Sequence, residues 1–279
     1  MKSPEQLKGA IRNIAEKKDI QAAAVLQMFL FERIIERLSL SSYKYQFILK
    51  GGLLIASLIG VDQRTTMDMD TTILGLSVDE ETMTRVISEL LNIDVNDGIV
   101  FTLKELKPIR EADQYENFCA TILADYGKIH ATLKIDITTG DAITPREISY
   151  RYPFMFEDKS VTVMAYPLET ILAEKYETIL RRNITSTRAR DLYDLYTLYN
   201  MKEDEVRIKV LREAILKTAN KRNSTEYLNQ YEDVYKLMSE DSSQEKMWLT
   251  YQRSNSFAKE ILYQDVIKTI LTIGKHLKV

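Results

Sequence analysis

The hydrophobic pattern of the chain changes near residue 165, and this change limits the folds that the sequence can adopt. Before it, short segments with the alternation of β-strands occur between helical segments; after it, apolar residues recur only at helical spacing. We therefore expect an α+β protein, in which residues 1–165 form a mixed β-sheet domain with N-terminal helices and residues 166–279 form a helical domain. A chain of 279 residues is long enough for two such domains.

The clearest strand covers residues 129–138, in which apolar residues from Ile129 to Ile137 alternate with polar residues that include Lys134 and Asp136. The turn sequence before it predicts a hairpin with the preceding strand. Further strands are expected at residues 46–49, 67–74, 99–106, 117–126 and 161–164. Helices are expected at residues 5–39, 53–59, 77–92, 167–182, 188–200, 204–219, 224–240 and 256–277.

The composition excludes several kinds of chemistry. One cysteine and two histidines rule out a disulfide framework and leave almost no ligands for a zinc or non-haem iron site. Any metal must therefore be held mostly by carboxylate oxygens, which favours Mg²⁺ or Mn²⁺.

A net charge of −3 argues against an overall basic nucleic-acid-binding surface. The sequence has no secretory signal and no apolar segment of the ~20 residues that cross a bilayer, so we expect a cytoplasmic protein without membrane contact.

Three acidic residues stand on predicted strands. Asp68 and Asp70 are alternate residues of one strand, so their carboxylates share a face and repel each other unless a cation lies between them. Asp136 is flanked by Ile135 and Ile137 on another strand. Three carboxylates from two neighbouring strands can hold two metal ions about 3.5–4 Å apart, as phosphoryl-transfer sites do. The alternative is a solvent-facing strand that carries two acids.

A second candidate element is Lys50-Gly51-Gly52, at the end of an apolar segment and directly before a helix. Glycine lets backbone N–H groups approach phosphate oxygens, and a helix N-terminus adds partial positive charge. A plain turn is the alternative.

Two other residues lie on the expected strands. Lys134 is near the acids and either stabilises charge or pairs with one of them, and Cys119 is expected to be a buried small hydrophobe.

Together these motifs resemble the DNA polymerase β-like nucleotidyltransferase superfamily, whose pattern is an apolar residue, a Gly-Gly or Gly-Ser pair, a spacer, an Asp-x-Asp motif and a later acid between apolar residues. The segment from Phe47 to Asp70 is more narrowly similar to the AbiEii family, which comprises toxins of type IV toxin–antitoxin and phage abortive-infection systems. In that family an arginine commonly precedes the Asp-x-Asp motif by four residues, as Arg64 does here. The resemblance implies a nucleotidyltransferase-type fold for the sheet domain.

Two helices of the second domain also resemble the AbiEii pattern. Helical spacing places Lys175 within the apolar stripe of the first, where its ammonium either reaches solvent along its stem or points into an interdomain cleft towards nucleotide phosphates. In the second helix Asp191 borders the apolar stripe and Asp194 lies farther out, so Asp191 is the expected functional acid. The alternative for Asp191 is an ion pair with Lys175 or Arg190 that only ties the helices together.

A local basic run extends from Lys175 to Arg190, where five basic residues stand against a single acid, Glu177. Such a run is usually a solvated helix end and loop. Next to a carboxylate–metal site it can also steer a triphosphate or an RNA backbone, because both carry closely spaced negative charges. No zinc finger, RNA-recognition motif or other dedicated nucleic-acid module is present in the sequence.

The resemblance implies a Mg²⁺- or Mn²⁺-dependent enzyme that transfers nucleotides from an NTP to an RNA, with a tRNA 3′ end as the expected acceptor. The expected effect is growth arrest in antiviral defence, relieved by a separately encoded antitoxin. A small-molecule nucleotidyltransferase of the aminoglycoside-modifying type and a catalytically silent nucleotide-binding protein are the alternatives. The residues implied are Asp68, Asp70 and Asp136 for metal and catalysis, Lys50, Gly51, Gly52 and Arg64 for the nucleotide, and Lys175 and Asp191 from a helical domain that closes the cleft.

Overall fold

The computed structural model describes residues 3–109 and 117–277, and the chain divides into two compact units. The short segment Asp141–Glu147 belongs to the helical unit, although it precedes residue 165 in the sequence. Unit 1 comprises residues Met1–Gly140 and Ile148–Ala165, and unit 2 comprises residues Asp141–Glu147 and Tyr166–Val279.

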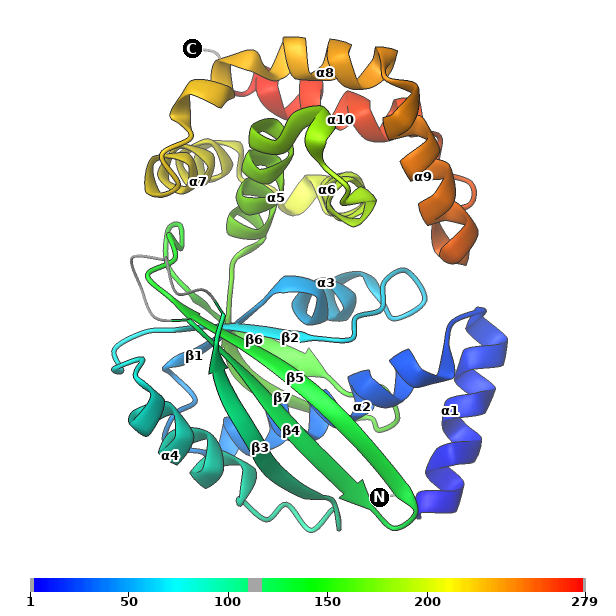
Figure 1. Ribbon diagram of the computed structural model, residues 1–279, viewed down its shortest axis with the longest axis vertical. Coiled ribbons are helices and arrows are strands. Elements are labelled where there is room, and N and C mark those ends of the chain that lie inside the picture. Colours follow the sequence, from blue (N-terminus) through cyan, green and yellow to red (C-terminus); the bar gives the residue numbers. More distant parts are fainter. Residues whose placement is uncertain (1–2, 110–116, 278–279) are drawn as a thin grey trace. The chain divides into compact units, whose positions relative to one another are not determined.

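Unit 1 is built on a mixed β-sheet (Figure 1). Within the described residues, seven strands follow the order β3-β4-β5-β2-β1-β7-β6. The β2–β5 and β1–β7 pairs are parallel, and the other pairs are antiparallel. The strands are β1 (Phe47–Lys50), β2 (Met69–Ile73), β3 (Val100–Pro108), β4 (Phe118–Tyr126), β5 (Ile129–Thr139), β6 (Ile148–Pro153) and β7 (Ser160–Ala165).

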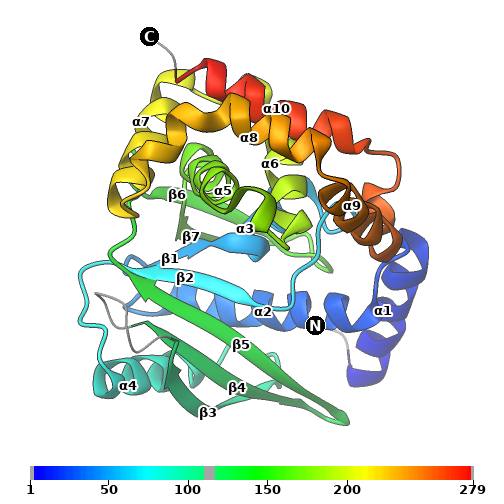
Figure 2. The same cartoon turned by 45° about the horizontal axis from the view of Figure 1, so that its top comes forward.

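Helices cover both faces of this sheet. Figure 1 shows α3 on one face and α2 with α4 on the other, and Figure 2 shows the same arrangement from a second direction. Ile34 and Leu38 of α2 line a small apolar cavity together with Ile135 and Ile137 of β5, so the apolar side of β5 faces the core. The helices of unit 1 are α1 (Pro4–Lys18), α2 (Ala22–Leu40), α3 (Gly51–Ile59) and α4 (Glu80–Leu91).

The N-terminal segment forms two helices, so the expectation of one helix over residues 5–39 is wrong. α1 begins with a capping box, in which the side chains of Ser3 and Gln6 each accept a hydrogen bond from the other's backbone N–H, and Pro4 occupies the first helical turn. It ends at Asp19, whose φ of 50° is in the left-handed region. Asp tolerates this conformation better than most residues, so the break needs no Gly or Pro and leaves no signal in the hydrophobic period.

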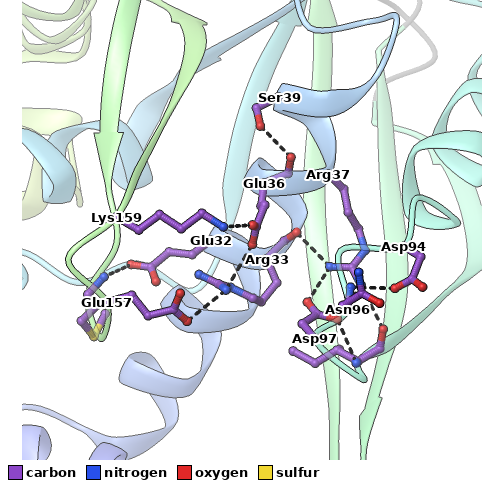
Figure 3. A network of polar contacts seen from close by, with 12 residues as sticks. Glu32, Arg33, Glu36, Arg37, Ser39, Asp94, Asn96, Asp97, Glu157 and Lys159 are labelled. Carbon is purple, nitrogen blue, oxygen red and sulfur yellow. Dashed lines mark hydrogen bonds and ion pairs between the residues drawn. The ribbon is translucent and has the colours of Figure 1, made fainter. Parts of the chain in front are cut away.

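A network of buried charges fixes α2 to neighbouring loops (Figure 3). Arg37 binds the carboxylate of Asp97 through two parallel hydrogen bonds of 2.8 Å. Glu36 forms ion pairs with Arg33 on its own helix and with Lys159 in the loop before β7. Because each of these charges has an oppositely charged partner, α2 can bury a charged run that would otherwise be excluded from the core.

Unit 2 contains only helices among its described residues. α5 packs on α6 and α7, and α10 packs on α6 and α8. Two of its buried aromatic side chains donate hydrogen bonds to backbone carbonyls: the hydroxyl of Tyr176 to that of Ile270, and the indole N–H of Trp248 to that of Ile261. The helices are α5 (Leu168–Arg182), α6 (Ala189–Met201), α7 (Ile208–Lys221), α8 (Tyr231–Glu240), α9 (Ser242–Ser254) and α10 (Tyr263–Lys275).

The sequence did not predict β6 or α9. β6 is an edge strand with mostly exposed side chains, and α9 buries only Gln244 and Trp248, so neither has a strong apolar period. α10 begins at Tyr263, later than the expected helix over residues 256–277. Across residues 3–109 and 117–277, no helix is long and apolar enough to cross a membrane.

Candidate active site

A row of polar residues crosses four neighbouring strands of unit 1. In the strand register, Lys50 of β1 pairs with Asp70 of β2, Asp70 pairs with Asp136 of β5, and Asp136 pairs with Cys119 of β4. Directly paired residues point to the same side of a sheet, so these four side chains share one face. The strands of Asp70 and Asp136 are therefore adjacent and in register, as a shared carboxylate site requires.

Gly51 lies directly against Asp70. Its φ of +64° is in the left-handed region, which glycine adopts without a steric penalty. A Cβ atom at this position would lie 1.9 Å from Oδ2 of Asp70, far inside van der Waals contact. The turn from β1 into α3 therefore needs glycine for two separate reasons. The first N–H groups of α3 begin beside the Asp70 carboxylate, and they have no acceptor within the helix.

Gly52 packs against the segment that leads into β2. A Cβ atom there would lie 2.8 Å from Oγ1 of Thr66 and 3.0 Å from Nη2 of Arg64. Arg64 is only 2% exposed and donates a hydrogen bond to the carbonyl oxygen of Thr65. Arg64 therefore supports the start of α3 and the approach to β2 from a buried position.

Lys50 connects β1 to β5 across the acidic row. Its Nζ donates a hydrogen bond of 2.7 Å to Oγ1 of Thr138. Thr138 lies two residues after Asp136 and on the same face of β5. The ammonium therefore lies beside the paired carboxylates of Asp70 and Asp136, where its charge offsets part of their repulsion. The sequence did not identify Thr138 as a residue of this site. The one indication was its position on the polar face of the expected strand.

Asp68 differs from Asp70 in its exposure. It precedes the first residue of β2 and is exposed, whereas Asp70 is half-buried. In the described part of the chain, no group of three or more Asp, Glu, His or Cys side chains is arranged to hold a metal ion. The donor chemistry nevertheless fits Mg²⁺ or Mn²⁺, because the aligned pair Asp70 and Asp136 offers carboxylate oxygens and the exposed Asp68 can rotate towards them.

Cys119 belongs to this row, whereas we expected a buried small hydrophobe. It is half-buried and is the register partner of Asp136. Burial raises the pKa of its thiol to about 11, and the carboxylate of Asp136 adds to the increase, while the charge of Lys134 opposes it. A thiol that stays protonated at neutral pH is a hydrogen-bond donor and a poor nucleophile. Cys119 therefore donates towards Asp136 and does not act as a nucleophile.

In unit 2, Lys175 lies between two carboxylates. Its Nζ is 2.6 Å from Oδ1 of Asp191 and 3.0 Å from Oδ2 of Asp194. The side chain of Asp194 is 0% exposed and that of Asp191 is 10% exposed, so the expectation that Asp194 lies farther out is wrong. α6 packs on α5, α9 and α10 at once, and a single apolar stripe does not describe a helix that is covered on several sides.

The basic run at the α5–α6 junction is partly neutralised within unit 2. Arg181 and Arg222 both bind the carboxylate of Glu177, at 2.6 and 2.5 Å. Burial raises the pKa of Glu177, but its hydrogen bonds with Arg222 and Arg181 outweigh this effect and hold the pKa below the usual value. Arg188 and Arg190 are exposed at the start of α6. The cationic surface of this run is therefore smaller than the sequence count indicates.

The fold defined by this sheet and its helices is that of nucleotidyltransferase-type proteins. A solved structure from H. pylori, described as that of a candidate nucleotidyltransferase, is 18% identical and has a TM-score of 0.51, with 92% of this chain and 97% of that chain covered. The structure of JHP933 from Helicobacter pylori is 18% identical, with a TM-score of 0.50 and coverage of 91% and 93%. At these identities the likeness concerns the fold alone. No curated protein matches the chain significantly.

The family follows from the sequence match. The model of the AbiEii nucleotidyl transferase toxins of type IV toxin–antitoxin systems matches residues 33–271. Because this match covers most of the chain, the protein belongs to the AbiEii family. It is a nucleotidyltransferase that uses an NTP, and its family functions together with a separate antitoxin.

Proposed function

We propose that the protein transfers a nucleotidyl group from an NTP to the 3′-terminal hydroxyl of an RNA, with tRNA as the acceptor. The observation that carries this proposal is the register pair of Asp70 and Asp136 beside the positive-φ residue Gly51. Carboxylates bind cations, and the N-terminus of a helix binds phosphate, so this arrangement accommodates both groups side by side.

We assign a divalent cation to Asp68, Asp70 and Asp136. When bound, Mg²⁺ or Mn²⁺ neutralises negative charge on the phosphoryl oxygens and orients the reacting groups. The protein itself contributes the fixed register of Asp70 and Asp136 and the nearby ammonium of Lys50. Without a cation, the ammonium of Lys50 offsets part of the charge of the acidic row.

The nucleotide phosphates bind at the start of α3 in this proposal. Gly51 and Gly52 leave no side chain over the first turn, so the N–H groups of the helix can donate to the β- and γ-phosphates. Lys50, the residue before this turn, adds positive charge on the same side. Arg64 contributes to nucleotide binding by supporting the turn, since its guanidinium is buried against Gly52.

The reaction is an in-line displacement at the α-phosphorus. The oxygen of the acceptor hydroxyl forms a bond to the α-phosphorus, and the bond from this phosphorus to the bridging oxygen of the β-phosphate breaks. Pyrophosphate leaves with the electrons of that bond. The hydroxyl proton passes to the carboxylate of Asp136, which acts as the general base. The N–H groups of α3 stabilise the charge that develops on the departing pyrophosphate.

Lys175 is proposed to neutralise phosphate charge. It must then exchange one of its carboxylate partners for a phosphate oxygen. Asp191 is the partner that yields, because its side chain is 10% exposed while that of Asp194 is 0% exposed. Asp194 stays with Lys175 and holds its side chain in place. This assigns Asp191 a functional role and Asp194 a positioning role.

In the cell, this activity would arrest growth by modifying tRNA, and the antitoxin encoded separately would relieve the arrest. The system would serve as a defence in which infected cells stop growing before a phage multiplies. The membership of the chain in a type IV toxin family supports this part of the proposal.

The test is transfer of label from each of the four NTPs to total RNA by the purified protein. We expect labelled RNA of tRNA size that requires Mg²⁺ or Mn²⁺ and is lost in Asp70→Asn. The matched control is Asp158→Asn, an isosteric change at an exposed carboxylate of unit 1, which should retain activity. Label on an aminoglycoside without label on RNA would establish the small-molecule alternative. Nucleotide binding without any transfer would establish a silent protein.

A further inference from the structure

The strands β3, β4 and β5 carry polar side chains on the same face as Asp136. α2 and α4 lie on the opposite face, and α3, the helix of unit 1 on this side, packs on β1 and β2 (Figure 1). We call this polar surface the open face. The residues that define it are Glu105 and Lys107 of β3, Asp125 of β4, and His130, Thr132 and Lys134 of β5.

Two pairs of charged or polar side chains on the open face contact each other. Nζ of Lys107 lies 2.8 Å from Oε2 of Glu105 on the same strand. Nδ1 of His130 lies 2.5 Å from Oδ1 of Asp125, its register partner on β4. The register places Lys107 level with Cys119 and Asp136, and Glu105 level with Lys134, so this neutral pair lies beside the acidic row. His130 and Asp125 lie at the other end of the face, near the β4–β5 turn. Lys134 is the charged residue of the open face for which the described part of the chain provides no ion pair.

Lys134 stands at the boundary between the open face and the acidic row. It is exposed and lies two residues before Asp136, so their Cα atoms are about 7 Å apart along the strand, at ~3.3 Å per residue. Its charge acts on the thiol of Cys119, the register partner of Asp136. The ammonium therefore lies near the acids without being bound to any of them.

We propose that Lys134 binds the phosphodiester that precedes the terminal hydroxyl of the RNA acceptor, and that the open face supports the end of this strand. The inference rests on the proposed function, because it takes Asp136 as the group that receives the hydroxyl proton. It adds the site at which the acceptor binds and a residue that positions it.

The need for this contact follows from the charges. An RNA strand that brings its terminal hydroxyl to Asp136 also brings a phosphodiester close to three carboxylates, and these charges repel each other. Lys134 is placed about one nucleotide away from Asp136, where a cation offsets this repulsion. A small-molecule acceptor has no phosphodiester at this position. The open face therefore favours a nucleic-acid strand over a small molecule.

Direct binding tests the inference without relying on transfer. The full-length protein, without NTP, is titrated into a fluorescein-labelled single-stranded RNA with a free 3′-hydroxyl, and anisotropy is followed at several salt concentrations. We expect Lys134→Ala to raise Kd about tenfold, the effect of one charge-assisted contact, and to reduce the salt slope by about 0.7. Lys134→Arg should restore both values. Lys17→Ala, which removes an exposed lysine of α1, should bind as the wild type does.

A second probe identifies the phosphate. An RNA whose last linkage is a neutral methylphosphonate should bind the wild type about tenfold more weakly and should bind Lys134→Ala no more weakly than normal RNA does. Equal binding by Lys134→Ala and Lys17→Ala overturns the inference, as does a methylphosphonate penalty that persists in Lys134→Ala or wild-type protein that does not bind RNA. Absence of RNA labelling in the transfer assay instead overturns the proposed function, and the two failures are therefore distinguishable.

Discussion

The carboxylate of Asp70 lies so close to Gly51 that position 51 has no room for a side chain: a Cβ atom there would lie 1.9 Å from Oδ2 of Asp70. Gly51→Ala should therefore displace the Asp70 carboxylate as well as strain the backbone. We expect at least a hundredfold loss of transfer activity, because an interaction of roughly 3 kcal/mol at the reacting groups is lost. The loss is measured as the initial rate of RNA labelling.

The control for this change is Gly75→Ala. Gly75 has a similar φ of +70°, but nothing lies within 4 Å of its added Cβ atom. This variant should show the backbone strain alone, roughly 1–2 kcal/mol of stability, with transfer retained. If Gly51→Ala loses no more activity than Gly75→Ala, the contact with Asp70 has no part in the site.

Metal removal is the second prediction. Asp70 and Asp136 are register neighbours, so a bound cation relieves their repulsion and should raise the melting temperature of the protein. We expect EDTA to abolish transfer, excess Mg²⁺ or Mn²⁺ to restore it, and either ion to increase Tm in differential scanning fluorimetry. Asp70→Asn should lose this increase, while Asp158→Asn should keep it. An equal increase in both variants would place the cation elsewhere.

The elements that the sequence predicted are those with a strong period. β5 was predicted because apolar and polar residues alternate over residues 129–138, and the turn residues before it predicted the hairpin with β4. β6 was missed because it is an edge strand in which Tyr152 is the only buried residue. α9 was missed because it is mainly polar and packs through a few side chains such as Trp248.

The candidate site was predictable only in part. The residue types and the spacing of Asp68 and Asp70 indicated carboxylate chemistry, but the alignment of Asp70 with Asp136 depends on the pairing of β2 with β5, which a local pattern does not encode. The same limit applies to Cys119, whose place in the row comes from the register of β4. Local periodicity cannot reveal which residues meet across a sheet.

The third prediction concerns the two partners of Lys175. Asp194 is fully buried, so Asp194→Asn removes one of the negatively charged partners of the Lys175 ammonium in an environment without water. The change should destabilise unit 2 by roughly 3 kcal/mol. Asp191→Asn should destabilise it less, because the Asp191 side chain is partly exposed. Urea unfolding measures both values.

The control is Glu213→Gln, which breaks the exposed pair with Lys217 and should change stability by about 0.5 kcal/mol or less. A smaller effect of Asp194→Asn than of Asp191→Asn would contradict the burial argument.

The fourth prediction concerns Glu32 in the network on α2. Burial raises the pKa of this carboxyl from 4.5 to about 8, although the backbone N–H of Met155 and the charge of Arg33 act in the opposite direction. The charge of Glu157 adds to the increase, and Tyr152 packs nearby with its own pKa raised by burial. The folded protein therefore keeps a proton on Glu32 in a pH range in which the unfolded chain has lost it.

The sign of the pH effect follows from these two values. Between pH 4.5 and about 8 the folded state binds more protons than the unfolded state, so the free energy of unfolding falls as the pH rises and levels off above about pH 8. The decrease assigned to Glu32 amounts to roughly a few kcal/mol. Glu32→Gln, which stays neutral, should remove this part of the decrease. Urea unfolding from pH 5 to pH 9 measures it, since this range covers most of the window and extends beyond its upper end. Glu81→Gln, at an exposed position of α4, should leave the profile unchanged. Profiles of equal slope for Glu32→Gln and the wild type would show that Glu32 is ionised in the folded protein at neutral pH.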